Sequence, residues 1–264
     1  MALENEQKAI VLWNKNHKEK DKLVKIFTEK HGKLMCYARG IHQKNSMLKS
    51  VIQPFSCAVF LGKFNDDGLS FLNAAKEVES FSMIQQDIFI HAHATYILGL
   101  LDAAIEDRQE DRKLFHLVEL ALILLNNGND EQIITNIFEV QLLPKFGMTP
   151  NWLSCAICGE THGAFDYSML YGGVICQKHW DKDKRRLHGT PKVVHLLRIF
   201  SQIPYERIGN ITVKKETKNE LRRLIDLLYE EYVGIHLKSK TFLNQMNTWE
   251  DRLKLTDKTN EMPK

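Results

Sequence analysis

No hydrophobic run in this sequence is long enough to span a lipid bilayer. The two longest apolar stretches, 92–105 and 114–125, fall short of the roughly 20 residues required, and both contain charged side chains. The first seven residues are acidic and polar, without the basic start and apolar core of a secretory signal peptide. We therefore expect a cytoplasmic protein that does not engage a membrane.

The common motifs of catalytic sites are also missing. The sequence has no glycine-rich phosphate loop ending in Lys-Ser/Thr, no Gly-x-Gly-x-x-Gly after a strand and no nucleophile elbow. Paired acids such as Asp66-Asp67 and Glu230-Glu231 fall in a turn and on a charged helix face. These patterns favour a protein that is not an enzyme.

Cysteine is scarce, with five residues in a chain of 264. Three of them fall in one short window, 155–176, which is unlike the spread of cysteines in a secreted disulfide framework. The other two, Cys36 and Cys57, have apolar neighbours, and we expect them to be small buried side chains.

The clustered cysteines belong to two ligand pairs with the same spacing. Two residues separate Cys155 from Cys158 and Cys176 from His179, and the segment 159–175 connects the pairs. A two-residue gap lets a tight turn direct both side chains at one ion, so two such turns supply the four ligands of tetrahedral zinc. Four protein ligands leave no position for water, so we predict a structural Zn²⁺ that stabilises the fold.

Three other interpretations of this cluster remain open. A Cys-x-x-Cys pair can be a redox dithiol, although the strand–helix–strand pattern of thioredoxin-like proteins does not surround it. The cysteines can also be the buried remnant of a site that has lost its metal. Finally, His162 can replace His179 as a ligand; we prefer His179 because it repeats the two-residue gap.

Charge is distributed unevenly along the chain. Residues 1–53 hold 11 Lys/Arg and 5 Asp/Glu, a balance of +6, whereas residues 54–150 hold 6 and 14, a balance of −8. Residues 151–264 hold 19 and 14, a balance of +5. A basic start and a basic end around an acidic middle fit one surface that meets polyanions and another that meets proteins.

The hydrophobic pattern predicts an α+β protein. Five short apolar runs with intervening turns occupy the stretch 1–80, which favours a small closed barrel such as the five-stranded OB-fold. Spacing alone does not separate the OB-fold from another small barrel, and residues 23–30 also fit a helix. From about residue 83, apolar side chains recur at the three- and four-residue steps of buried helix faces. We expect an OB-fold domain (1–80), a first helical part (81–150), a zinc module (151–189), a second helical part (190–248) and a flexible tail (249–264).

One helix start carries a specific signal. Thr217 and Glu220 match a capping box, in which a hydroxyl and a glutamate three residues later satisfy free N–H groups. We expect a helix to start at Thr217.

Basic side chains near the start of the chain alternate with the aromatic residues Trp13, His17 and Tyr37. Lysines neutralise phosphates and aromatic rings stack on bases, as in OB barrels that hold single strands. A solvated lysine-rich surface explains the same pattern without a ligand. The residues that we expect to contact DNA are Lys15, Lys18, Lys22, Arg39, Lys44 and Lys49 in the barrel and Lys184, Arg185 and Arg186 beside the predicted zinc module.

Several motifs, in this order and spacing, resemble those of the bacterial RecO family of recombination and repair proteins. The resemblance covers residues 8–243. The motifs are Ile10-Val11-Leu12, Asp21-Lys22-Leu23-Val24, His31-Gly32-Lys33, Ala38-Arg39-Gly40, Gln53-Pro54-Phe55, Phe146-Gly147-Met148-Thr149-Pro150 before Cys155, and Lys238-Ser239-Lys240-Thr241-Phe242-Leu243.

This resemblance implies an N-terminal OB-fold, a helical C-terminal domain and a zinc module. It implies binding of single- and double-stranded DNA and annealing of complementary strands. It also implies work with RecR, and sometimes RecF, to load RecA on DNA coated by single-stranded DNA-binding protein, whose acidic C-terminal tail would bind the helical domain. When it is bound to DNA, the protein would be associated with the nucleoid.

Two positions depart from the family pattern. Zinc-bearing members usually have four cysteines, whereas His179 stands at the fourth position here, and histidine is also a good zinc ligand. Trp13 stands where many members have arginine. The tryptophan either replaces a phosphate contact with stacking on a base, or shows that the position is not critical.

Two further hypotheses belong to other functional classes. The chain can be a zinc-containing OB-fold interaction protein that binds RNA or protein, which competition between DNA and RNA oligonucleotides would distinguish. It can also be a zinc hydrolase, which requires a metal with three protein ligands and an open position.

Overall fold

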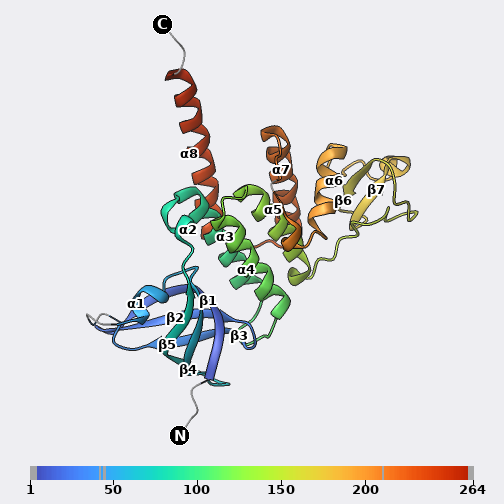
Figure 1. Cartoon of the computed structure of the whole chain (residues 1–264). Helices are drawn as coiled ribbons and strands as arrows, with labels where there is room; N and C mark the ends of the chain where they lie inside the picture. The colour runs from blue at the N-terminus through green and yellow to red at the C-terminus, as the bar shows by residue number, and fades with distance from the viewer. Residues whose placement is uncertain (1–4, 42, 44–45, 210, 261–264) are drawn as a thin grey trace. The chain divides into compact units, whose positions relative to one another are not determined.

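The computed structural model describes residues 5–41, 43, 46–209 and 211–260, with side chains described as far as residue 249. The chain forms two compact units (Figure 1). Unit 1 comprises residues 1–128 and 237–264, and unit 2 comprises residues 129–236. The five-part division drawn on the sequence stays a prediction. Within the described residues, no helix is both long enough and apolar enough to cross a membrane.

The N-terminal part of unit 1 is a closed five-stranded barrel, as the sequence predicts (Figure 1, blue to teal). The strands follow the order β1-β2-β3-β5-β4, and all pairs are antiparallel except β3 with β5. Residues 23–30, which also fitted a helix, lie mostly in strand β2. The elements are β1 (Asn5–His17), β2 (Asp21–Thr28), β3 (Gly32–Ala38), helix α1 (Leu48–Val51), β4 (Cys57–Lys63) and β5 (Ser70–Glu79).

A bulge in β1 decides which side chains of this strand face outward. Val11 pairs with Ile26 and packs in the barrel core, but the register shifts between Val11 and Trp13, so Trp13 pairs with Lys25. Side chains alternate along a regular strand, so Trp13 would otherwise share the inward face of Val11. After the bulge the outward positions are Trp13, Lys15 and His17, and none of these three belongs to the core cluster.

Four helices complete unit 1: α2 (Ser82–Gln86), α3 (Ile88–Ala104), α4 (Arg112–Asn126) and α8 (Lys238–Asn260). The Asp87 carboxylate caps α3 by accepting from the N–H of Phe89 at 2.8 Å. Helix α8 starts directly against α3, because a Cβ atom added at Gly99 would lie 2.5 Å from the Ser239 hydroxyl. Residues 249–260, which the sequence analysis assigns to a flexible tail, extend α8, and residues 261–264 lie outside the described part.

Three lysines of the basic N-terminal segment form ion pairs with acidic residues of the segment that follows. The ion pairs join Lys25 to Asp107 (2.5 Å), Lys33 to Asp102 (2.7 Å) and Lys8 to Glu119 (2.6 Å). Lys25 and Lys33 are buried as a result. Part of the charge asymmetry along the sequence therefore reflects contacts inside unit 1.

Unit 2 combines three α-helices with a two-stranded sheet. Its elements are α5 (Glu131–Leu142), the 3₁₀ turn η1 (Leu143–Phe146), strands β6 (Phe165–Ser168) and β7 (Gly173–Cys176), the 3₁₀ turn η2 (Gln177–Lys182), α6 (Pro191–Phe200), the 3₁₀ turn η3 (Tyr205–Arg207) and α7 (Lys215–Tyr232). Glu139 on α5 is fully buried, and both of its carboxylate oxygens accept from Arg222 on α7. This ion pair joins the two helices inside the unit.

The capping box predicted at Thr217 is wrong. Helix α7 begins two residues earlier, at Lys215, and the side chain of its N-cap residue, Lys214, makes no capping hydrogen bond. The Glu220 carboxylate instead accepts from the backbone N–H of Thr190 at 2.6 Å and from its hydroxyl at 2.9 Å. The glutamate therefore satisfies the start of α6, a contact between distant residues that a local motif does not report.

Candidate nucleic-acid interface and metal centre

Three aromatic rings form a row on the outer surface of the barrel. His17, at the end of β1, meets the Tyr37 ring of β3 edge to face, with ring centroids 5.6 Å apart. Tyr37 meets Phe71 of β5 in the same manner at 6.1 Å, because the two residues are partners in the parallel β3–β5 pair. All three side chains are half-buried, so each ring keeps an exposed part. We call His17, Tyr37 and Phe71 the aromatic row.

Arg39 places a cation over this row. Its guanidinium carbon lies 5.8 Å from the Tyr37 ring centroid and 5.5 Å from the Phe71 ring centroid, and the residue is exposed. A guanidinium over aromatic faces is favourable, and it keeps N–H groups available for phosphate oxygens. The arrangement offers stacking surfaces and a phosphate-binding cation within one patch.

The orientation of Tyr37 is fixed by Asp21. The Tyr37 hydroxyl donates to the Asp21 carboxylate, which also accepts from the N–H of Gly40 at 2.8 Å. The bond to Asp21 raises the pKa of Tyr37, and the same bond, followed by that from Gly40, lowers the pKa of Asp21. Tyr37 is therefore a neutral hydrogen-bond donor, and its ring is held in place for stacking.

The other predicted DNA contacts in the N-terminal part occupy different environments. Lys15 is exposed, with its Nζ atom 5.9 Å from the Trp13 ring centroid. Lys18 is exposed in the β1–β2 turn, next to the aromatic row. Lys22 is half-buried and donates to the Asn14 side chain at 2.7 Å, and Lys49 is exposed on α1. Lys44 lies outside the described residues.

Unit 2 contains the predicted metal-binding cluster. The ligand atoms of Cys155, Cys158, Cys176 and His179 all lie within 4.8 Å of one another. Cys176 ends β7, and His179 follows in the turn η2, so a strand end and a turn aim two ligands at one point. Cys155 and Cys158 come from the turn at 155–158, where the N–H of Gly159 donates to the Cys155 carbonyl at 2.8 Å.

The distances within this cluster suit a tetrahedral metal ion. With Zn–S bonds of about 2.3 Å, two sulfur ligands of such an ion lie about 3.8 Å apart. The Sγ atoms of Cys158 and Cys176 are separated by 3.9 Å, and His179 Nδ1 lies 3.5 Å from Cys155 Sγ and 3.3 Å from Cys176 Sγ. The four residues can therefore hold a metal ion.

The charge state of Cys155 also suits metal binding. Burial raises the pKa of its thiol, but the N–H groups of Cys176, Cys158 and Ile157, together with the His179 ring, outweigh burial and lower the pKa to about 6. The thiolate, which is the form that binds metals, is then available at neutral pH.

His162 does not join the cluster. Its side chain is 92% exposed, and its Nδ1 atom lies 2.8 Å from the Thr161 hydroxyl and 3.8 Å from a carboxylate oxygen of Glu160. Of the two candidate histidines, the structure brings only His179 to the cysteines.

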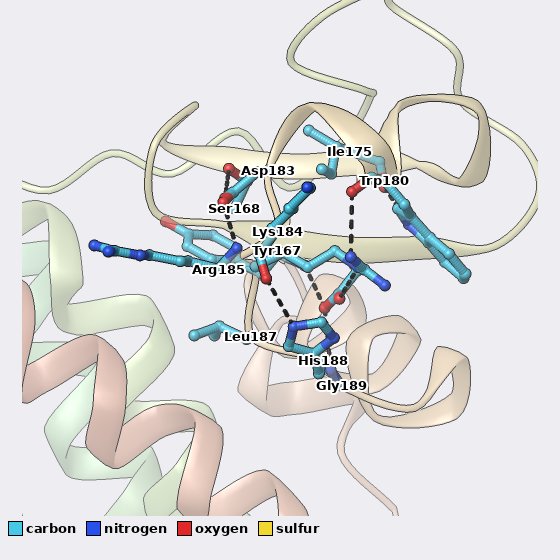
Figure 2. A network of polar contacts seen from close by, with 12 residues as sticks. Tyr167, Ser168, Ile175, Trp180, Asp183, Lys184, Arg185, Leu187, His188 and Gly189 are labelled. Atoms are coloured by element: carbon cyan, nitrogen blue, oxygen red, sulfur yellow. Dashed lines mark hydrogen bonds and ion pairs between the residues drawn. The ribbon is translucent and has the colours of Figure 1, made fainter.

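A short loop after the cluster presents basic side chains (Figure 2). The buried Asp183 carboxylate accepts from the Ser168 hydroxyl at 2.5 Å and from the N–H of Arg185 at 2.8 Å. His188 donates from Nε2 to the Lys184 carbonyl at 3.1 Å. These bonds hold the backbone of residues 183–188, from which the exposed side chains of Lys184 and Arg185 extend.

Arg186 differs from its two neighbours. Its Nε atom forms an ion pair with Asp166 at 2.9 Å, one of its terminal nitrogens donates to the Trp180 carbonyl at 3.2 Å, and its guanidinium lies over the Trp180 ring. Of the three basic residues predicted in this loop, Arg186 contacts its own unit, and the other two point to solvent.

Sequence reasoning missed Phe71, which completes the aromatic row. Phe71 lies far from Tyr37 along the chain, and only the parallel β3–β5 pairing brings the two together. Asp183 was also missed, because an aspartate among basic residues, with Asp181 two residues before it, carries no signal of burial. Neither position has a local pattern that would have identified it.

Comparisons with known proteins agree over the whole chain. Residues 1–81 match the family described as "Recombination protein O N terminal", and residues 85–241 match "Recombination protein O C terminal". The chain is 56% identical over 261 residues to the DNA repair protein RecO of Enterococcus faecalis, covering 99% of both chains. It is 45% identical over 245 residues to the protein of the same name from Streptococcus pneumoniae, covering 93% of this chain and 95% of the relative. The chain is 44% identical over 249 residues to the DNA repair protein RecO of Lactococcus lactis subsp. cremoris, covering 94% of this chain and 98% of the relative.

Proposed function

The chain belongs to the RecO family of DNA repair proteins, and from that premise we propose that it binds single- and double-stranded DNA and anneals complementary strands. The observation that supports this proposal most directly is the aromatic row of the barrel with Arg39 above it. Rings that stack on bases bind every base, and basic residues neutralise the backbone, so the expected binding is tolerant of sequence.

Phosphate contacts are assigned to the basic residues around this row. Arg39, Lys15 and Lys18 are exposed on or beside it, which leaves their charges available to a strand. Lys22 and Lys49 are further proposed phosphate contacts, and so is Lys44, which lies outside the described residues. In unit 2, Lys184 and Arg185 form a second basic surface, and Arg186 supports the loop that carries them.

Annealing requires no catalytic group in this proposal. Two complementary strands repel each other through their phosphates, and cationic surfaces lower that repulsion. The strand on the barrel exchanges stacking on the aromatic row for pairing with its complement. The second basic surface would hold the backbone of the incoming strand or of the duplex product.

The family relationship also suggests the partners. We propose that the protein acts with RecR, and in some steps RecF, to load RecA on DNA coated by single-stranded DNA-binding protein. The acidic C-terminal tail of that coating protein is the proposed ligand of the helical domain. The setting is the cytoplasm, at the nucleoid when the protein is bound to DNA.

We further propose that Cys155, Cys158, Cys176 and His179 hold a structural Zn²⁺. The support is the match of the ligand distances to a tetrahedron and the low pKa of Cys155. A bound ion would fix the turn at 155–158 to the end of β7, next to the basic loop.

Charge reversal at Arg39 is expected to weaken binding of an oligothymidylate at least about tenfold, because a phosphate contact is replaced by repulsion. Fluorescence anisotropy between about 50 and 200 mM salt measures both the affinity and its salt dependence. In Arg39→Glu the slope of log affinity against log salt should fall by about one or more. Lys113→Glu, which makes the same charge change on the exposed start of α4, is the control and should behave almost like the unmodified protein.

An affinity that barely changes with salt would contradict the electrostatic proposal. Tighter binding of an oligoribonucleotide than of its DNA counterpart in the same assay would favour an RNA-binding protein instead.

A second experiment tests annealing on DNA coated by single-stranded DNA-binding protein. Arg39→Glu should slow annealing through weaker strand binding. The double change Lys184→Glu with Arg185→Glu should slow annealing several-fold while affinity of the barrel for one strand stays close to normal, because these residues lie in unit 2. Annealing unaffected by the double change would remove the second basic surface from the proposal.

A further inference from the structure

We propose that a pocket beside the aromatic row accepts a single nucleobase turned out of the bound DNA strand. This inference rests on the proposed function, because it requires a strand on the outer face of the barrel. It goes further by assigning a defined site to one base, where the aromatic row offers only open stacking surfaces. The pocket lies entirely within unit 1, between β1 and α3.

The pocket has the size and lining of a small-ligand site. Its volume is about 340 Å³, at the lower end of the range for small-molecule pockets, and most of its wall is apolar. Trp13 and Leu12 of β1, Phe55, and Leu98 of α3 provide this wall. Aromatic rings in the wall suit a flat heterocycle, because base–aromatic stacking is favourable for any base.

A few polar groups stand among these apolar side chains. Thr95 on α3, Ser239 on α8 and His91 are among the lining residues. His91 packs edge to face on Phe55, with centroids 5.0 Å apart, and its Nδ1 atom lies 3.2 Å from the Ile84 carbonyl. That carbonyl can accept a hydrogen bond from Nδ1–H, and in that tautomer Nε2 carries no hydrogen and is an acceptor. The side chains of these three residues carry the kinds of hydrogen-bonding group that suit the edge of a base.

The charges around the pocket suit a phosphate backbone at its mouth. The Asp102 carboxylate also lines the pocket, but it is paired with Lys33 at 2.7 Å, which balances its charge. Lys15 is exposed next to the Trp13 ring, and Lys238, adjacent to Ser239, is exposed as well. The cations are therefore at the edge, where the flanking phosphates of an inserted base would lie.

The pocket also continues the proposed DNA-binding face. Trp13, Lys15 and His17 are successive outward positions of β1. The outer face of β1 therefore carries, in order, a residue of the aromatic row, a lysine and a residue of the pocket wall. At about 3.3 Å per residue, Trp13 lies roughly 13 Å from His17 along β1. A DNA strand that stacks on the aromatic row and runs along β1 would bring a base close to the one on the aromatic row to the pocket.

The test uses the full-length protein and oligothymidylates that carry one abasic site at each position in turn. Loss of the inserted base should weaken binding about five- to tenfold at one position, because stacking on one aromatic site is lost. Thr95→Trp, which fills the pocket, should remove this positional effect, whereas Thr95→Val, which keeps the volume, should retain most of it. Trp13→Ala, which removes the stacking wall without filling the pocket, should also remove the positional effect.

Crosslinking gives a second readout that does not depend on affinity. An oligothymidylate with one 5-iododeoxyuridine at the sensitive position should crosslink under light to Trp13, Phe55 or His91, as mapped by peptide mass spectrometry. Crosslinks confined to His17, Tyr37 and Phe71, or an abasic effect that survives in both Thr95→Trp and Trp13→Ala, would overturn the pocket while salt-sensitive binding through Arg39 would still stand. Failure of the unmodified protein to bind any oligonucleotide would overturn the proposed function as well. If Thr95→Trp abolished capture of an acidic peptide and left every DNA measurement unchanged, the pocket would belong to a protein ligand and this inference would be wrong.

Discussion

Replacing Cys155 by alanine should abolish binding of the proposed Zn²⁺ in unit 2 and unfold the segment 151–189, at a cost of more than about 4 kcal/mol, the range expected when a structural metal is lost. The sheet in this segment has only two strands of four residues, β6 and β7. Such a small sheet is marginal without further support. The four ligands join the turn at 155–158 to the end of β7, so the ion would supply the missing support.

Three measurements check this expectation. Elemental analysis should find about one zinc per chain in the unmodified protein and almost none in Cys155→Ala. Calorimetry should show a destabilised unit 2, and limited proteolysis should cut within residues 151–189. His162→Ala is the matched control, because this histidine lies in the same segment outside the cluster and is 92% exposed. It should keep its metal and its unfolding temperature.

Whether Cys155→Ala first loses stability or first loses DNA handling distinguishes a structural from a direct role of the proposed metal. Single-strand binding by the barrel should persist in Cys155→Ala, since the ligands and the aromatic row lie in different units. A Cys155→Ala protein that lost its metal, remained fully folded and failed to anneal strands would show a direct role for the metal in DNA handling and would contradict a purely structural one.

Arg222→Met should destabilise unit 2 by about 3–5 kcal/mol, because it leaves the Glu139 carboxylate buried without its cation. Glu139 is fully buried, and the guanidinium of Arg222 reaches its two oxygens at 2.5 and 2.9 Å. The same guanidinium donates to the Asn136 side chain at 3.3 Å and pairs with Asp226 at 2.9 Å. Truncation of this one side chain therefore disrupts contacts between α5 and α7 and along α7.

A double-mutant cycle identifies the cause. Glu139→Leu combined with Arg222→Met should recover most of the lost stability, because apolar residues often replace a buried ion pair at little cost. Asp226→Asn serves as the control for the exposed side of the network and should cost less than about 1 kcal/mol. Denaturant unfolding of the unmodified protein, Glu139→Leu, Arg222→Met and the double variant measures the coupling energy between the two side chains. If the double variant were as unstable as Arg222→Met, loss of packing would explain the effect, and loss of the Arg222 cation beside the Glu139 carboxylate would not.

Local spacing in the sequence was sufficient to indicate the metal cluster, the five-stranded barrel and the buried helix faces. Two residues between ligands allow only a tight turn, so the pairs Cys155–Cys158 and Cys176–His179 indicated the cluster before its geometry was known. Five short apolar runs indicated a barrel, and three- and four-residue spacing indicated helices. The capping box at Thr217 failed because four residues of local pattern do not show whether a distant group, here Thr190, binds the glutamate.

Only the tertiary structure decided which basic residues stay exposed and which aromatic residues lie on the outer face of the barrel. Lys25 and Lys33 resemble Lys15 in the sequence, but Asp107 and Asp102 pair with them and remove them from the surface. Such pairing joins residues that are distant along the chain, and no local pattern encodes it.

The same distinction applies to the outer face of the barrel. The sequence shows aromatic residues near lysines along the chain. The bulge after Val11 turns Trp13 outward, and the parallel β3–β5 pairing brings Phe71 next to Tyr37. The sequence by itself indicated the five strands of the barrel, the buried helix faces and the four-residue metal cluster, because these depend on short-range backbone geometry. The tertiary structure alone decided the composition of the proposed DNA-binding face and of the pocket beside it, because both depend on strand register and on long-range packing.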